Sequence, residues 1–239
     1  MTYHLLSYPR SGNHMVRTLL EYGFGRPTLG CFESRRDTPI YQREPNRRTG
    51  LIQITNEAPI GYKSHFILET IKAEMAYGEI PGLAIIVRDP VAAIASHTCR
   101  SIKGLTAFKP KEIRRKVEHG LNSYMALVHY FRSRPAERKL VVEFERLLDP
   151  DTQLDYANGL LRRLDCETRL DRDQLDRLLV VSKDSQETLR KNRPALMADM
   201  RAQVAAAVSY AEVKDLLYDV GVGAQMASSE TRSKLRMAT

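Results

Sequence analysis

Short aliphatic runs alternate along the chain with longer segments in which apolar residues recur every three or four positions. The runs have the length and the β-branched content of strands, and Leu83–Val87 is apolar without interruption, which is typical of a strand covered on both faces. We expect strands over 3–8, 60–65, 83–87 and 139–144, and helices over 15–22, 91–96, 111–131, 154–164, 173–179, 195–208 and 211–220. Strands that alternate with helices predict an α/β fold with a parallel sheet flanked by helices.

The domain organisation follows from where this alternation stops. After Phe144 the pattern is almost entirely helical, and 23–59 is rich in Arg, Pro, Thr and Asn without steady periodicity, so we expect long loops there. The chain has 239 residues, which suffices for one domain, and we place that domain at 1–222. The segment 223–239 is small and polar, and we expect it to be a disordered tail.

The net charge indicates the class of ligand, and the cysteines indicate the redox compartment. There are 37 Lys and Arg against 29 Asp and Glu, a formal charge of +8 that suits a polyanionic ligand. Cys31, Cys99 and Cys166 lie far apart and outside any CxxC pairing, so they indicate neither a disulfide framework nor a thiolate zinc site. The start of the chain does not resemble a signal peptide, and no apolar run approaches the roughly 20 residues that span a bilayer. We therefore expect a soluble, cytoplasmic protein.

Residues 8–14 join the first predicted strand to the first predicted helix through a short loop with a central glycine. Such a junction directs backbone N–H groups and the positive end of a helix toward one point, which is how proteins hold a phosphate or a sulfate. Arg10 adds a positive charge, while Ser11 and Asn13 add neutral donors. The pattern GxxxxGK[ST] is absent, which disfavours an ordinary ATP or GTP hydrolase. Taken alone, an ordinary strand–turn–helix with a surface arginine explains the segment equally well.

The string Tyr8-Pro9-Arg10-Ser11-Gly12-Asn13 resembles the 5′-phosphosulfate loop of the sulfotransferases that use 3′-phosphoadenosine 5′-phosphosulfate as donor. The usual forms of that loop are YPKSGTTW and, in many bacterial members, YPRSGN-T-W. His14 and Met15 stand where the family usually has Thr and a Trp that packs on adenine, and this chain has no Trp. The resemblance implies a P-loop NTPase-like sulfotransferase fold with a helical C-terminal part. It also implies that the donor lies along Pro9, Arg10, Ser11, Gly12, Asn13, His14 and Met15.

Lys63 and His65 lie two apart on the second predicted strand, so they should project to the same face while Ser64 points away. Histidine suits general-base work because its unperturbed pKa lies near neutrality. The pair resembles the K-T-H strand of the same family, which implies that His65 removes the acceptor proton and that Lys63 and Arg10 stabilise charge around the transferring group. For an isolated histidine, the alternative is a hydrogen-bonded residue at the end of a strand.

Arg88 and Ser96 lie eight residues apart after the third predicted strand. An arginine offers charge-assisted, bidentate bonds and a serine offers a neutral donor, a suitable pair for a phosphate dianion. The spacing resembles the family's 3′-phosphate motif, which implies that both residues hold the phosphate that marks the donor. Between them, Asp89-Pro90 predicts a capped helix start, and that local role alone would also explain the segment.

Two further segments resemble the family more loosely. The strand that ends at Phe144 resembles one that ends in YE-D-L, with Phe in place of Tyr, which implies a place for Phe144 beside adenine. Arg190 and Lys191 resemble the start of the RKGxxG segment, whose glycines are missing here, and the resemblance implies contact with the donor. A basic helix end explains the second segment equally well.

Together these motifs predict transfer of a sulfuryl group to a hydroxyl or amine of a small-molecule or carbohydrate acceptor. His4, His119 and His129 lack partners at metal-ligand spacing, so no metal is expected. The basic runs lack the interleaved aromatic residues of a nucleic-acid surface, so no nucleic-acid partner is expected. The alternatives are a phosphotransferase that uses the same loop on a nucleoside triphosphate, and a non-catalytic nucleotide or nucleic-acid binder.

Overall fold

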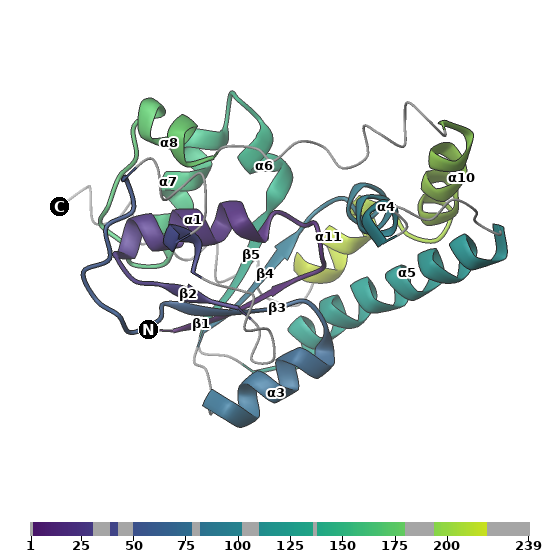
Figure 1. The fold of residues 1–239 in the computed structure, drawn as a ribbon, viewed down its shortest axis with the longest axis horizontal. Coiled ribbons are helices and arrows are strands. Elements are labelled where there is room, and N and C mark those ends of the chain that lie inside the picture. The colour runs from purple at the N-terminus through teal and green to yellow at the C-terminus, as the bar shows by residue number, and fades with distance from the viewer. Residues whose placement is uncertain are drawn as a thin grey trace.

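The computed structural model describes residues 2–30, 39–42, 50–77, 82–101, 110–135, 138–179 and 194–218. Its sheet has five strands in the order β2-β3-β1-β4-β5, and every neighbouring pair is parallel (Figure 1). The strands are β1 (Tyr3–Ser7), β2 (Thr28–Leu29), β3 (Gly61–Ser64), β4 (Gly82–Val87) and β5 (Arg138–Glu143). The predicted α/β fold with a parallel sheet flanked by helices is confirmed.

Helices form a layer on each side of this sheet (Figure 1). One layer contains α1 (Asn13–Phe24), α7 (Gln153–Arg163) and α8 (Arg172–Leu178). The other contains α3 (Ile67–Tyr77), α4 (Pro90–Ser101), α5 (Pro110–Ser133), α10 (Pro194–Ala205) and α11 (Tyr210–Tyr218). Two short helical segments, η1 (Ile40–Gln42) and α6 (Phe144–Leu148), complete the described elements. The helical C-terminal part therefore supplies helices to both layers.

The aliphatic runs form strands because each is buried on both faces. In β4, Ala84 and Ile86 pack in the core beneath α1, whereas Leu83 and Ile85 pack in the core beneath α4 and α5. Successive side chains on a strand point to opposite faces, so a strand covered on both sides has no polar positions to alternate with apolar ones.

Four features differ from the sequence-based expectation. Helix α3 was not predicted, because three of its large apolar residues, Leu68, Ile71 and Met75, are exposed and the helix has no clear polar face. Strand β2 and η1 lie within the stretch that was expected to be irregular. Phe144 begins α6 instead of ending β5. By contrast, the predicted helix cap at Asp89 is confirmed, since its Oδ1 accepts from the Val91 N–H at 2.7 Å.

At the carboxyl end of β1, the connections to the following helices change from one face of the sheet to the other. Strand β1 lies between β3 and β4, yet the helix that follows β1 covers one face of the sheet and the helices that follow its two neighbours cover the other. The connections therefore leave this edge of the sheet toward opposite faces. In parallel α/β sheets, ligands bind at such a switch point.

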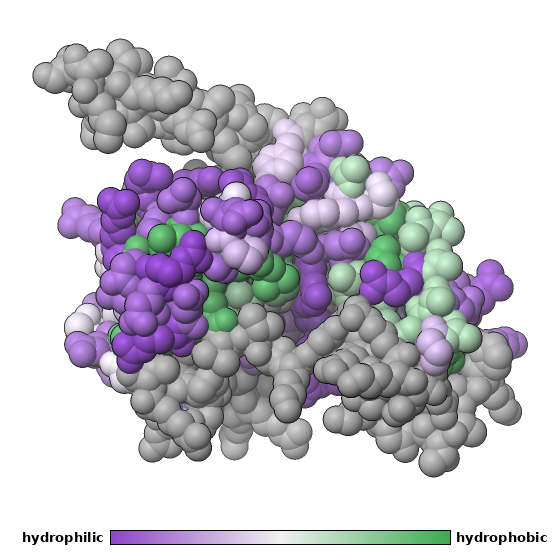
Figure 2. All heavy atoms as spheres, turned by 90° about the horizontal axis from the view of Figure 1, so that it is seen from above, coloured by the Kyte–Doolittle hydropathy of each residue, from purple (hydrophilic) through white to green (hydrophobic). Residues whose placement is uncertain are grey.

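On the face seen in Figure 2, the described residues are mainly hydrophilic. Seen from above, hydrophilic side chains dominate the left of the molecule, and paler hydrophobic residues gather on the right, on the side where Figure 1 places α10 (Figure 2). Within the described ranges, no helix is both long enough and apolar enough to cross a membrane.

Candidate active site

The loop after β1 begins with a tight turn over Tyr8–Ser11. The Ser11 N–H donates to the Tyr8 carbonyl at 3.1 Å, with Pro9 and Arg10 between them. Arg10 has a φ of 72°, so the turn resembles type II, in which the third residue is left-handed and is usually glycine. A non-glycine residue in this region costs on the order of 1–3 kcal/mol, and such strain is concentrated at functional sites.

Gly12 links the turn to α1 and tolerates no side chain. Its φ is 83°, and a Cβ at this position would lie 2.0 Å from the Phe144 ring. Phe144 is only 6% exposed because its ring closes over this glycine. This close approach lets α1 begin at Asn13, at the carboxyl end of β1, where a helix supplies no acceptor for its first two amides, whereas the Met15 N–H donates to the Gly12 carbonyl at 3.0 Å.

Two buried polar atoms in the loop have no hydrogen-bond partner in the structure. They are Ser11 Oγ, on a residue that is fully buried, and Asn13 Oδ1, on a residue that is 7% exposed. Each such atom costs on the order of 1–3 kcal/mol. A ligand oxygen could accept from the Ser11 hydroxyl, and the Asn13 amide could turn its N–H₂ group toward the same ligand. These residues therefore fit an oxyanion.

Two arginines from different segments meet at this loop. Arg88 Nη1 donates to the Arg10 carbonyl at 2.7 Å, and Arg10 Nε donates to Ser96 Oγ at 3.3 Å. The Arg88 guanidinium also lies 5.2 Å from the centre of the Phe144 ring. The structure thus brings Arg10, Arg88 and Ser96 together, but it links them through the loop itself, so Arg88 supports the backbone that carries Arg10.

His65 follows β3 directly and is oriented by β1. Its Nδ1 lies 2.7 Å from the Ser7 carbonyl oxygen and 3.2 Å from Ser7 Oγ, while its backbone N–H donates to Glu69 Oε2 at 2.7 Å. A carbonyl can only accept, so Nδ1 carries the proton, and whenever the ring is neutral its lone pair is on Nε2. That tautomer is the one a general base requires.

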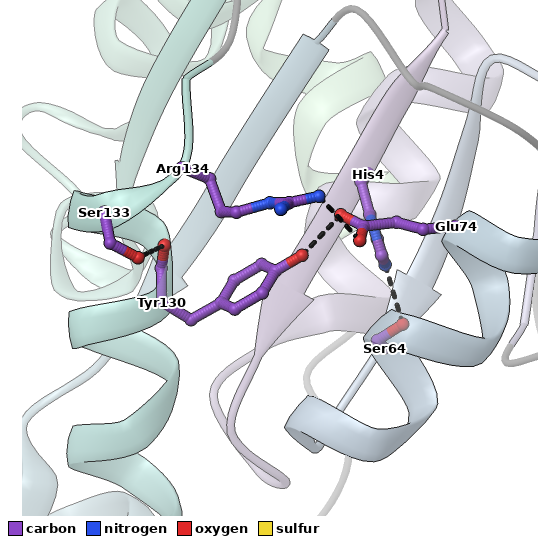
Figure 3. A network of polar contacts seen from close by, with 6 residues as sticks. All are labelled: His4, Ser64, Glu74, Tyr130, Ser133 and Arg134. Carbon is purple, nitrogen blue, oxygen red and sulfur yellow. Dashed lines mark hydrogen bonds and ion pairs between the residues drawn. The ribbon is translucent and has the colours of Figure 1, made fainter.

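Lys63 and Ser64 separate to opposite faces of the sheet, as predicted. Lys63 is opposite Leu5 in the register, on the face that α1 covers, and is 7% exposed. On the other face, Ser64 Oγ lies 2.7 Å from His4 Nε2, and beside them Glu74 accepts from Tyr130 and, at 2.8 Å, from Arg134 (Figure 3).

The His4–Ser64 pair superficially resembles a hydrolase nucleophile and its base. His4 is 1% exposed and Ser64 is fully buried, so no substrate reaches them. Burial lowers the pKa of His4 to about 4, although the nearby Glu74 carboxylate opposes this shift. The pair therefore has a structural role in the core.

Most of the residues singled out by sequence meet at one edge of the sheet. The set that gathers at the carboxyl ends of β1, β3, β4 and β5 comprises Pro9, Arg10, Ser11, Gly12, Asn13, Lys63, His65, Arg88, Ser96 and Phe144. His14 is exposed at the start of α1, whereas Met15 packs into the hydrophobic core beneath that helix. Arg190 and Lys191 lie outside the described residues.

The sequence did not reveal the residues that orient this set. Ser7 orients His65, and Tyr124 donates its hydroxyl hydrogen to the Arg88 carbonyl at 2.6 Å. Burial raises the pKa of Tyr124, so it remains a donor at neutral pH. Ser7 is at least visible as a polar residue that ends an apolar strand, whereas Tyr124, in the middle of α5, carries no local signal.

Two of the pockets lined by described residues bear on the location of the site. One, of about 350 Å³, lies beside the loop and is lined by Tyr8, Phe66, His97, Thr98, Arg115, Lys116 and His119. The other, of about 580 Å³, is lined by acidic, basic and neutral side chains that lie between Asp155 and Arg169, and it includes none of the predicted site residues. We therefore relate only the first pocket to the site. No group of described His, Cys, Asp and Glu side chains is arranged to hold a metal ion.

The fold and this edge define a parallel α/β protein with a strand–loop–helix junction at the switch point of its sheet. Neither a scan against protein-family models nor a search of curated proteins finds a match for this chain.

Proposed function

We propose that this protein transfers a sulfuryl group from 3′-phosphoadenosine 5′-phosphosulfate to a hydroxyl or amine of a small-molecule or carbohydrate acceptor. One observation carries the proposal: a loop that contains Arg10 and an unpaired buried hydroxyl, and that Arg88 supports from the end of β4, lies beside a histidine whose Nδ1 is held protonated by Ser7. An anion-binding loop and a positioned base are the two elements that group transfer to a hydroxyl requires.

On the donor side, the nucleotide supplies an activated sulfuryl group bound through a bridging oxygen to its 5′-phosphate. The α1 first-turn amides, the Ser11 hydroxyl and the Asn13 amide would bind the phosphate oxygens. Arg10 would turn from Ser96 toward the bridging oxygen, which would leave the Ser96 hydroxyl for the 3′-phosphate. Arg88 would hold the Arg10 carbonyl in place throughout.

On the acceptor side, His65 Nε2 takes the proton of the attacking hydroxyl or amine. A bond forms between that oxygen or nitrogen and sulfur as the bond from sulfur to the bridging oxygen breaks, and the electron pair stays on the bridging oxygen. Arg10 and Lys63 neutralise the charge that develops there. The Ser7 carbonyl stabilises the imidazolium through the Nδ1 proton, which it already accepts.

A thermal-shift panel of adenosine 3′,5′-bisphosphate, ATP, GTP and single-stranded DNA tests the proposal. A ligand at a hundred times its Kd stabilises a protein by about 2.7 kcal/mol, which raises the Tm of a chain of this size by about 5–10 °C. We expect this shift for the bisphosphate alone. Selective stabilisation by ATP or GTP would instead indicate a phosphotransferase, and stabilisation by DNA would indicate a nucleic-acid binder. Transfer of radioactive sulfate from the labelled donor to a panel of acceptors completes the test.

A further inference from the structure

The 350 Å³ pocket beside the loop is strongly basic. Arg115 and Lys116 are exposed on α5, His119 lies one turn further along, and His97 on α4 is half-buried between them and Tyr8. None of the described residues that line the pocket is acidic. Glu118, which lies on the same helix, pairs with Arg114 outside the pocket at 3.3 Å.

The electrostatics of His97 report the same excess of positive charge. Burial lowers the pKa of His97, and the surrounding charges of Arg10, Lys116, Arg100 and His119 lower it further. Each of these groups disfavours a further proton on the imidazole, and each would favour a bound anion. The pocket is therefore charged to receive an anionic group.

The pocket is also next to the reacting end of the proposed site. Phe66 lines it and immediately follows His65, with ring centres 6.4 Å apart. Tyr8, the first residue of the loop, meets the His97 ring edge-on, with ring centres 5.5 Å apart. Ser96, which precedes His97 on α4, accepts a hydrogen bond from Arg10. A molecule in this pocket would lie beside both the base and the loop, where an acceptor must be.

The remaining lining groups suit a sugar. Phe66 and Tyr8 present aromatic rings, while Thr98 and the two imidazoles present neutral hydrogen-bonding groups suited to hydroxyls. The volume lies at the lower end of the range for ligand pockets, which matches one ring better than an extended strand. A concave pocket of this size also differs from the open groove that a nucleic-acid strand requires.

We propose that this pocket binds the anionic ring of an acidic saccharide, a sugar that carries a carboxylate or a sulfate, as the acceptor of the reaction. This inference rests on the proposed function, because it names the class of acceptor. Arg115 and Lys116 would contact the anionic group, His97 and Thr98 would contact hydroxyls, and Phe66 would position the ring beside His65.

Calorimetric titration with two hexasaccharides, one acidic and one uncharged, tests this assignment. One probe is a hexasaccharide of alternating glucuronic acid and N-acetylglucosamine, and the other is the uncharged N-acetylglucosamine hexamer, both titrated with and without saturating adenosine 3′,5′-bisphosphate. We expect the acidic probe to bind wild type at least tenfold more tightly. The double variant Arg115→Ala/Lys116→Ala should weaken that affinity by about five- to tenfold, as expected for two solvent-exposed charge contacts. Arg114→Ala on the same helix, outside the pocket, is the matched control and should change the affinity less than twofold.

The outcomes separate this inference from the proposed function. The assignment to an acidic saccharide is overturned if wild type binds both probes with equal affinity. It is also overturned if the double variant and Arg114→Ala lose equal affinity for the acidic probe. A double variant that instead weakens adenosine 3′,5′-bisphosphate, or a single-stranded oligonucleotide, assigns the pocket to a nucleotide phosphate or to nucleic acid and overturns it too. If the double variant selectively loses the acidic probe while wild type binds no bisphosphate, the saccharide site stands and the sulfotransferase proposal fails.

Discussion

Replacing Arg10 with glycine should separate the stability of this protein from its ligand binding. Arg10 holds a left-handed φ of 72° that costs on the order of 1–2 kcal/mol for a residue with a Cβ. Glycine removes that strain, but it also removes the 3.3 Å bond to Ser96, about 0.5–1 kcal/mol, and adds backbone entropy to the unfolded chain. The free energy of unfolding of Arg10→Gly should therefore stay within about 1 kcal/mol of wild type.

Arg10→Ala is the matched comparison, because it removes the same cation and the same bond while it keeps the strained backbone. It should be about 1 kcal/mol less stable than Arg10→Gly, the usual difference where a Cβ meets a positive φ. Both variants should weaken adenosine 3′,5′-bisphosphate about equally, by roughly 10- to 150-fold, which corresponds to a hydrogen bond to a charged group worth about 1.5–3 kcal/mol.

Urea unfolding measures the first quantity, and titration calorimetry at a temperature where every variant is folded measures the second. Equal stability of the two variants would show that the loop is not strained at Arg10. Undiminished nucleotide affinity in both would show that Arg10 does not contact the ligand. The two measurements are independent, so the prediction of backbone strain at Arg10 and the prediction of nucleotide binding by Arg10 can be refuted separately.

Three other predictions test the remaining parts of the site and core. His65→Ala should cut turnover by about 10²- to 10⁴-fold with nucleotide affinity unchanged, and near wild-type turnover would remove His65 from the mechanism. Ser96→Ala should weaken the binding of adenosine 3′,5′-bisphosphate but spare that of the 5′-monophosphate, whereas Arg88→Ala should weaken the binding of both, because Arg88 supports the Arg10 carbonyl. Calorimetry with both nucleotides measures these affinities, and a loss confined to the bisphosphate in Arg88→Ala would contradict the supporting role. His4 has a pKa of about 4 in the fold against 6.5 in the unfolded chain, so its neutral form contributes stability that is complete above pH 6.5 and is lost as the pH falls toward 4, about 3 kcal/mol in all. Urea unfolding of wild type and His4→Asn between pH 7 and pH 4 should show that the free energy of unfolding falls more steeply in wild type. Parallel curves for the two proteins would refute this prediction.

The sequence alone determined the elements whose signals are local. Leu83–Val87 is a strand because its unbroken aliphatic run is buried on both faces, and Asp89 begins α4 because its carboxylate reaches amides two and three residues ahead. The strand–loop–helix at residues 8–14 was likewise predictable, since Gly12 and its neighbours are adjacent in the chain.

Elements whose character depends on distant partners were not predictable. Phe144 continues an apolar run in sequence, yet it starts a helix, because its ring packs on Gly12, more than a hundred residues earlier. Helix α3 was missed because part of its apolar surface remains exposed, so its pattern does not distinguish a buried face from a solvent face.

The tertiary structure decided how the site residues work. The tautomer of His65 depends on a carbonyl 58 residues away, the Arg10 carbonyl is held from 78 residues away, and Arg10 reaches Ser96 across 86 residues. Residue types near a motif indicate which chemistry is available. Which proton sits on which atom, and which arginine supports the loop, depend on hydrogen bonds that exist only once the parallel strands have brought their carboxyl ends to one edge of the sheet.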